Sequence, residues 1–251
     1  MIFFHIFVPT TSHNAMKYLS FFILLFIGEL SVSAQHMFSR QFPFFNQLSS
    51  NEIFSIHQDR EGYFWIGTTN GLARYDGYQL NTFRTDYKNQ NLLTDNGITA
   101  INDNDLYVWI GTWKGLNLYN KQTCRITPFS DARLLDKVVD AITVDKDGNV
   151  WVSAGGMIYR CDSTAHIIKE YEVGNIQEGY AISNIYVDQQ KQLWAVGSRG
   201  IFRYEPETDS FFRYPPLGNG HTAYIMHQDS SGNYWIGTCL LYTSDAADDL
   251  I

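Results

Sequence analysis

A tryptophan recurs along this chain at nearly constant spacing, and each copy stands in nearly the same stretch of sequence. The copies are separated by 44, 42, 43 and 41 residues and lie at Trp65, Trp109, Trp151, Trp194 and Trp235. Each follows an apolar stretch and a polar turn and precedes a Gly, and in the first four copies a second apolar stretch comes next. A period of about 40 residues, made of short alternating stretches, is typical of propeller blades built from four antiparallel strands.

The first repeat predicts how one blade is built. We predict strands at residues 53–58, 63–68, 72–75 and 79–83. In the first turn, Asp59 can accept backbone N–H groups and Gly62 can take a positive φ. In the second and fourth repeats this Gly is replaced by Leu106 and Lys191, so another turn type is expected there. The predicted fold is all-β: a partial β-propeller of four-stranded antiparallel blades over residues 35–238, with four full blades and half of a fifth.

The repeated aromatic residues are interpreted as structural. One large aromatic side chain at a fixed offset in every repeat is what packing between blades requires. The five tryptophans are therefore predicted to form the blade core, and the same role is expected for four tyrosines: Tyr75, Tyr119, Tyr159 and Tyr204. A ligand contact should instead break the repeat.

Both ends of the chain differ from the repeats. Residues 1–34 are predicted to be a signal peptide, because Met16-Lys17 precedes the apolar residues 18–27 and Ala34 precedes a cleavage point. An uncleaved membrane anchor is the alternative, and residues 1–15 are interpreted as an upstream start that is not used. Residues 239–251 resemble a translated transposase-based sequencing adapter, so we expect a non-native tail and an amino-terminal fragment of a longer protein.

Composition and motifs narrow the function. The net charge of −8 disfavours binding to a nucleic-acid backbone, which needs clustered Lys and Arg. Cys124 and Cys161 are interpreted as two buried thiols, with a disulfide as the alternative. His57 and His227 each precede Gln-Asp, which favours a repeated strand end over a metal site. No catalytic residue, metal site or cofactor is predicted.

The segment from Asp59 to Tyr75, with the pattern Asp-x-x-Gly-x-x-Trp-Ile-Gly-Thr-x-x-Gly-Leu-x-x-Tyr, resembles the two-component regulator propeller repeat. The third and fourth repeats depart from it at residues 153–155 and 195–197. The resemblance implies the periplasmic sensor portion of a hybrid two-component histidine kinase and response regulator, anchored in the inner membrane. It further implies that sensor and kinase domains follow in the parent protein, that the parent forms a homodimer, and that the ligand is an oligosaccharide or another small periplasmic molecule.

Two other functions stay open: a secreted propeller enzyme acting on polysaccharide, and a scaffold that binds proteins. For the sensor, the predicted binding surface is the face where the turns between second and third strands emerge. Four residues that break the repeat there are the candidates: Asn70, Trp113, Lys114 and Arg199. Trp113 could stack on a sugar ring beside the cations. The alternative is that Trp113 only covers its own turn.

Overall fold

The computed structural model describes residues 42, 44–85, 92–173, 182–198, 200–214 and 222–238. Apart from residue 42, these belong to the second of two compact units, residues 44–251. The predicted signal peptide, Arg199 and the predicted non-native tail lie outside the described residues. Within the described part of the chain, no helix is both long and apolar enough to cross a membrane.

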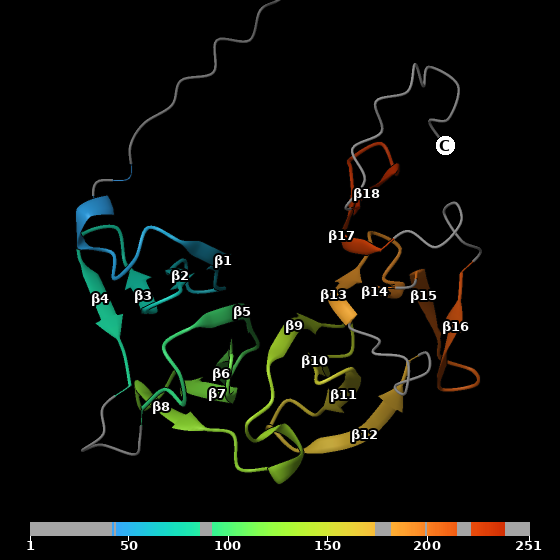
Figure 1. Ribbon diagram of the computed structural model, residues 1–251, viewed down its shortest axis with the longest axis horizontal. Helices are drawn as coiled ribbons and strands as arrows, with labels where there is room; N and C mark the ends of the chain where they lie inside the picture. Colours follow the sequence, from blue (N-terminus) through green and yellow to red (C-terminus); the bar gives the residue numbers. More distant parts are fainter. Residues whose placement is uncertain are drawn as a thin grey trace, which may run out of the picture. The chain divides into compact units, whose positions relative to one another are not determined.

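The described residues form five antiparallel sheets, which we call blades one to five (Figure 1). Blade one contains β1 (Ile53–Gln58), β2 (Phe64–Thr68), β3 (Gly71–Tyr75) and β4 (Leu80–Phe83). Blade two contains β5 (Ile98–Asp103), β6 (Tyr107–Thr112), β7 (Gly115–Asn120) and β8 (Arg125–Pro128). Blade three contains β9 (Val139–Val144), β10 (Val150–Ala154), β11 (Met157–Cys161) and β12 (Ile167–Glu172). Blade four contains β13 (Ile182–Val187), β14 (Leu193–Gly197), β15 (Gly200–Glu205) and β16 (Ser210–Arg213).

Blade five has two strands, β17 (Ala223–Gln228) and β18 (Tyr234–Thr238). The remaining elements in the described residues are short 3₁₀ helices, η1 (Phe45–Gln47) and η2 (Ala132–Leu134). The prediction of an all-β propeller with four full blades and half of a fifth is therefore confirmed. The predicted strands of blade one agree with the observed ones to within one residue.

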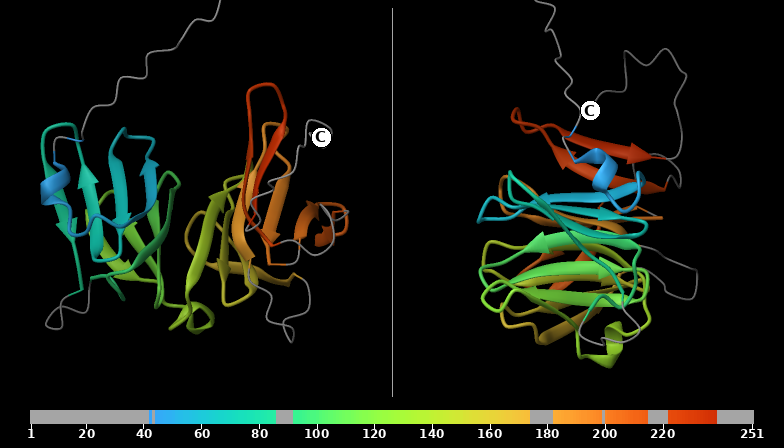
Figure 2. Two further views of the ribbon diagram at one scale, coloured as in Figure 1. Left: turned by 45° about the horizontal axis from the view of Figure 1, so that its top comes forward. Right: turned by 90° about the vertical axis from the view of Figure 1, so that its left-hand side faces the viewer.

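Consecutive blades pack through their inner strands, so that β1 contacts β5, β5 contacts β9, β9 contacts β13 and β13 contacts β17. Figure 2 shows the same sheets in two further views. The Gly of the Trp-Ile-Gly segment makes this approach close: a Cβ on Gly67 would lie 2.6 Å from Cγ2 of Ile98 in the next blade. A larger residue at this position would push the two blades apart.

The repeated Asp and Trp are joined by one recurring hydrogen bond. The indole Nε1 of Trp65 donates to Asp59 Oδ2 at 2.7 Å. The equivalent bonds in blades three, four and five measure 2.8, 2.8 and 2.9 Å. Blade two has Asn104 in place of the Asp, and the buried Nε1 of Trp109 has no partner among the described atoms. The Asp therefore both closes the turn and satisfies the buried indole.

Four of the five tryptophans are buried, with exposed fractions of 1, 0, 1 and 6 % in blades one to four. Trp235 differs from the expectation because 59 % of it is exposed. The reason is that Trp65 is covered by Phe83 of its own outer strand and by Tyr119 of the next blade. Blade five has no described outer strand or following blade to cover Trp235.

The register corrects the predicted set of tyrosines. Tyr75 and Tyr119 each pair with the residue before their blade's tryptophan, and Tyr204 directly follows Arg203, the partner of Trp194. The same position in blade three is Cys161, which pairs with Val150, whereas Tyr159 pairs with Val152. Tyr159 is buried but lies two residues away from the predicted position.

The turn without Gly in blade four has the same form as its Gly-containing counterparts, contrary to expectation. Lys191 has a φ of 66° and Gly62 one of 93°, and the N–H of each donates to the carbonyl of the turn Asp. Lys191 therefore accepts a left-handed conformation that glycine adopts without strain. Blade two does differ, since its turn is one residue shorter and Asn104 N–H donates to Tyr107 O.

Both described cysteines are thiols, and they differ in environment. Cys161 is buried, as predicted, and burial raises its pKa to about 12. Cys124 is exposed, contrary to the interpretation as a buried thiol, because it occupies a positive-φ position in the turn between β7 and β8.

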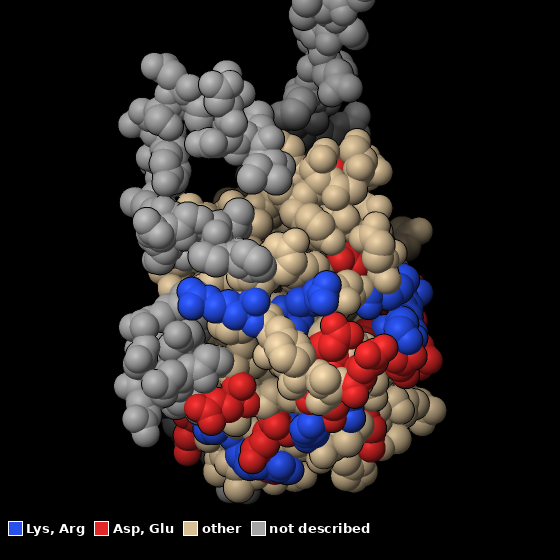
Figure 3. Space-filling view, turned by 90° about the vertical axis from the view of Figure 1, so that its right-hand side faces the viewer, with Lys and Arg blue, Asp and Glu red and all other residues tan. Residues whose placement is uncertain are grey.

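Charged side chains of both signs lie together on the face drawn in Figure 3. Ion pairs between such side chains form in blades three and four. Lys169 Nζ lies 2.6 Å from Asp209 Oδ2, and Arg203 Nη2 lies 3.1 Å from Glu205 Oε2. These cations are neutralised within the protein.

Candidate ligand-binding face

Each inner strand begins with a β-bulge, and the bulges lie at one end of the sheets. The register skips the second residue of the inner strand in every blade. The bulged residues are Phe54, Thr99, Asp140, Ser183 and Tyr224. Bulges re-aim side chains and occur often beside functional sites. The residue type differs in all five blades, so the side chain at this position varies while its backbone geometry repeats.

The turns between second and third strands emerge at the same end, because the start of each inner strand pairs with the end of the second strand. In blade one, Thr68 Oγ1 donates to Gly71 O at 2.8 Å and accepts from Asn70 N–H. In blade two, Thr112 Oγ1 makes the same 2.8 Å bond to Gly115 O. The two residues between Thr and Gly are thereby held at the surface and are free to vary in sequence.

Trp113 occupies this turn in blade two and is 44 % exposed. Its ring packs so closely on Gly97 that a Cβ there would lie 2.4 Å from its Cε3 atom. Phe54 of the neighbouring blade meets it edge to face, with ring centroids 6.2 Å apart. Phe54 is itself 56 % exposed. Trp113 therefore covers its turn and also forms, with Phe54, an exposed aromatic pair that spans two blades.

The other predicted site residues have different surroundings. Lys114 is mostly exposed, and its Nζ lies 3.9 Å from Asp95 Oδ2. Asn70 is exposed; its side chain donates to Ser49 O and its carbonyl accepts from Arg84. The structure thus places Lys114 beside Trp113 and ties Asn70 to residues of the first blade and the segment before it. Arg199 lies outside the described residues.

Sequence reasoning missed Phe54 and Asp140 as members of this face. The sequence signal for both is that the residue type at the second position of the inner strand differs from blade to blade. Asp140 is partly buried, and burial raises the pKa of its carboxyl to about 6. Asp140 is therefore a group at this end of the sheets that changes charge close to neutral pH.

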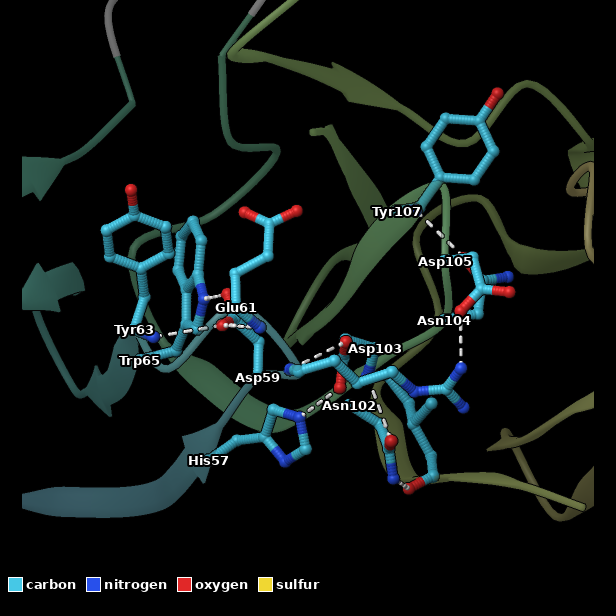
Figure 4. Close-up of polar contacts among 12 residues, drawn as sticks. His57, Asp59, Glu61, Tyr63, Trp65, Asn102, Asp103, Asn104, Asp105 and Tyr107 are labelled. Carbon is cyan, nitrogen blue, oxygen red and sulfur yellow. Dashed lines mark hydrogen bonds and ion pairs between the residues drawn. The ribbon is translucent and has the colours of Figure 1, made fainter. Parts of the chain in front are cut away.

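A polar cluster lies at the opposite end of the first two blades (Figure 4). His57 Nε2 of β1 lies 2.7 Å from Asp103 Oδ1 of β5, and Lys121 Nζ lies 2.8 Å from Asp103 Oδ2. Burial raises the pKa of Asp103, but the hydrogen bonds from His57 and Lys121 outweigh it and bring the pKa to about 2. Asp103 and Lys121 are 5 and 6 % exposed. Such a cluster clamps two blades together and offers little surface to a substrate.

The described residues contain no group of three or more His, Cys, Asp or Glu side chains arranged to hold a metal ion. His227, the second of the two histidines before Gln-Asp, contacts the ring of Tyr186 with centroids 6.0 Å apart. The two histidines therefore have different surroundings, one facing a carboxylate and the other an aromatic ring.

Comparison with solved structures supports the propeller fold. The extracellular domain of a putative one-component system from B. thetaiotaomicron superposes with a TM-score of 0.62 at 21% identity, over 80% of this chain and 27% of that one. A second structure, described as the extracellular domain of a putative hybrid two-component system from B. thetaiotaomicron, gives 0.51 at 20% identity, over 74% and 30%. Virginiamycin B lyase from Staphylococcus aureus gives 0.57 at 18% identity, over 74% and 62%.

The chain thus spans about a quarter of the first of these proteins. No curated protein sequence matches it. The family described as "Two component regulator propeller" matches residues 47–70, which include the Asp-to-Trp turn of blade one. The chain therefore carries the two-component regulator propeller repeat on a β-propeller fold, as its sequence predicts.

Proposed function

We propose that this chain is the ligand-sensing propeller of a periplasmic hybrid two-component signalling protein, and that it recognises an oligosaccharide. The observation that carries the proposal is the exposed pair of Phe54 and Trp113, with Lys114 beside it, on the face formed by the bulges and turns. Aromatic rings provide apolar stacking surfaces, and a neighbouring cation can bind hydroxyl or carboxylate groups.

The repeat family and the two sensor structures from B. thetaiotaomicron support the signalling class. Loops held on a rigid scaffold are the usual place for recognition, and the recurring Thr–Gly bond provides such a scaffold here. In this role the chain binds its ligand, and the kinase chemistry belongs to domains that follow it in the parent protein.

A secreted propeller enzyme is the alternative, since virginiamycin B lyase shares the fold. An enzyme would turn over its substrate without any kinase domain. His57 and Asp103 are the obvious acid–base pair, but their low exposure and their link to Lys121 favour a structural role.

Calorimetry of the full-length protein against a panel of oligosaccharides tests the sensing role. Trp113→Ala should weaken binding at least about tenfold, because stacking and desolvation at an aromatic hot spot are worth about 1–3 kcal/mol. Tyr78→Ala is the matched control, since Tyr78 is an exposed aromatic residue in the turn between β3 and β4, at the opposite end of the sheet. Equal affinity in the two variants would remove Trp113 from the site.

A further inference from the structure

Four polar side chains fill the outer part of the boundary between blades three and four, and their equivalents are missing between blades two and three. We call this set the plug; it consists of Arg160, Lys169, Tyr204 and Asp209. At the boundary between blades three and four, Arg160 stacks over the Trp151 ring at 5.7 Å and its Nη1 lies 3.2 Å from the Tyr204 hydroxyl. Lys169 Nζ and the Tyr204 hydroxyl both lie 2.6 Å from Asp209 carboxylate oxygens. Four long or charged side chains therefore fill the outer part of this boundary.

Strand register identifies the equivalent residues one blade earlier. Leu118 pairs with Trp109 and with Thr127, as Arg160 pairs with Trp151 and with Lys169. Cys161 stands where blade four has Tyr204, and Ala165 is the positive-φ turn residue where blade four has Asp209. Every member of the plug is thus replaced by a smaller or uncharged one: Leu118, Thr127, Cys161 and Ala165.

Blade one keeps the arginine and the tyrosine of the plug, so among the boundaries of blades one to four both are absent only between blades two and three. Arg74 lies over the rings of Tyr63 and Trp65, at 5.0 and 5.9 Å. Its Nη1 donates to the Tyr119 hydroxyl of blade two at 2.5 Å. At the boundary between blades two and three, Leu118 therefore replaces the arginine and Cys161 replaces its tyrosine partner.

A pocket of about 520 Å³ lies where the plug is missing, and it is lined by Tyr107, Leu118, Asn120, Thr123, Arg125 and Thr127. Tyr107, Asn120 and Arg125 lie opposite one another on three adjacent strands, on the same face as Leu118. Leu118 belongs to one buried cluster with Cys161 of blade three. This volume is in the range of small-molecule sites.

The polar groups of the pocket are available to a ligand. Arg125 is exposed, and no residue in the described part of the chain forms a hydrogen bond or ion pair with its guanidinium. The same holds, within those residues, for the hydroxyls of Tyr107, Thr123 and Thr127. A guanidinium binds carboxylate, sulfate or phosphate groups through paired hydrogen bonds, and the hydroxyls match those of a sugar.

We propose that this pocket binds a small sugar that carries one anionic group, with Arg125 on the anion and Tyr107, Thr123 and Thr127 on the ring and its hydroxyls. The site lies on the outer part of blade two, and it does not depend on the sensing role of the Trp113 face. The anion is a carboxylate, as in a uronic acid, or a sulfate ester, since Arg125 recognises the chemistry that the two share.

Calorimetric titration of the full chain with galacturonic acid, glucose 6-sulfate and neutral galactose tests the proposal. At least one anionic sugar should bind saturably and more tightly than galactose, and the better one identifies the anion. Arg125→Gln should weaken that binding at least about tenfold, because a charge-assisted hydrogen bond is lost. Arg133→Gln removes the same charge from the exposed η2 helix and should leave binding unchanged.

A second variant fills the pocket with the side chain that the repeat uses elsewhere. Leu118→Arg, with Cys161→Tyr to supply its partner, should rebuild the plug and abolish binding while the thermal transition is kept. Absence of saturable binding by either anionic sugar, or equal affinity in Arg125→Gln and Arg133→Gln, would overturn the proposal. Oligosaccharide binding that depends on Trp113 and not on Arg125 would overturn the pocket alone and leave the sensing role standing.

Discussion

Asp103→Asn and Asp105→Asn form a matched pair that tests the buried cluster of His57, Asp103 and Lys121. The two residues flank Asn104 in the sequence, and the carboxylate of each forms an ion pair with a cationic side chain. Asp103 and Lys121 are 5 and 6 % exposed, whereas Asp105 and its partner Arg60 are 83 and 58 % exposed. Breaking a buried pair leaves an uncompensated charge and costs about 3–5 kcal/mol, while an exposed pair is worth about 0–1 kcal/mol.

The pKa of Asp103 gives a similar magnitude. A fall from the ordinary value of about 3.9 to about 2 in the folded protein corresponds to about 2–3 kcal/mol at neutral pH. Because the folded pKa is lowered, this stability is present above about pH 4 and is lost as pH falls towards 2. The free energy of unfolding of Asp103→Asn should therefore be about 3 kcal/mol lower than that of the unsubstituted protein at pH 7, and the difference should shrink on acidification.

Urea denaturation at pH 7 and at intervals down to pH 2.5, followed by tryptophan fluorescence, measures both effects. Asp105→Asn should stay within about 1 kcal/mol of the unsubstituted protein at neutral pH. Equal destabilisation by the two substitutions, or a difference for Asp103→Asn that does not change with pH, would refute the clamp.

Three further predictions concern the core and the candidate face. Trp151→Ala should lower the free energy of unfolding by about 3–5 kcal/mol and Trp235→Ala by less than about 1 kcal/mol, as denaturant unfolding can measure; equal effects would contradict their different burial. Asp140→Asn should raise stability by about 2 kcal/mol at pH 7 and not at pH 4, because a folded pKa of about 6 makes ionisation of this carboxyl unfavourable above pH 4; a gain that is constant with pH would argue against it. Gly97→Ala should displace the Trp113 indole and change its fluorescence, and an unchanged emission spectrum would mean that the close contact is wrong.

Much of the fold was predictable because its determinants are local and repeated. The Trp-Ile-Gly segment places one strand in each blade, and the turn with Asp59 and Gly62 places the strand before it. The turn at Lys191 was mispredicted from residue type alone. The missing glycine suggested another turn, but Lys191 adopts the same left-handed conformation. The burial of Trp235 was mispredicted because a repeated residue is buried only where its neighbours repeat as well.

The candidate face was only partly predictable. Trp113 and Lys114 were found because they break the repeat in a turn, and Phe54 breaks it at the second residue of an inner strand. Their contact depends on how blade one packs on blade two, which no periodicity within one blade encodes. The clamp of His57, Asp103 and Lys121 likewise joins residues that are up to 64 positions apart.

The pocket at the outer edge of blade two left a sequence signal that is clear only in the correct register. Arg74 and Tyr119 form a pair across one blade boundary, and Arg160 and Tyr204 form the same pair across another. Placing Tyr159 in the tyrosine series hid the change at Cys161, because the missing tyrosine then seemed to be present. The structural register removes that error and shows both partners lost at the same boundary.

The sensing role is tested most directly by following binding and turnover in one experiment. The full-length protein is titrated calorimetrically with the oligosaccharides of the panel, and each mixture is then incubated and the sugars are examined by mass spectrometry. We predict saturable binding of at least one oligosaccharide, weakened by Trp113→Ala, with the sugar recovered at its original mass. Shortened or unsaturated products formed by the unsubstituted protein would instead indicate an enzyme, and absence of binding across the panel would contradict oligosaccharide recognition.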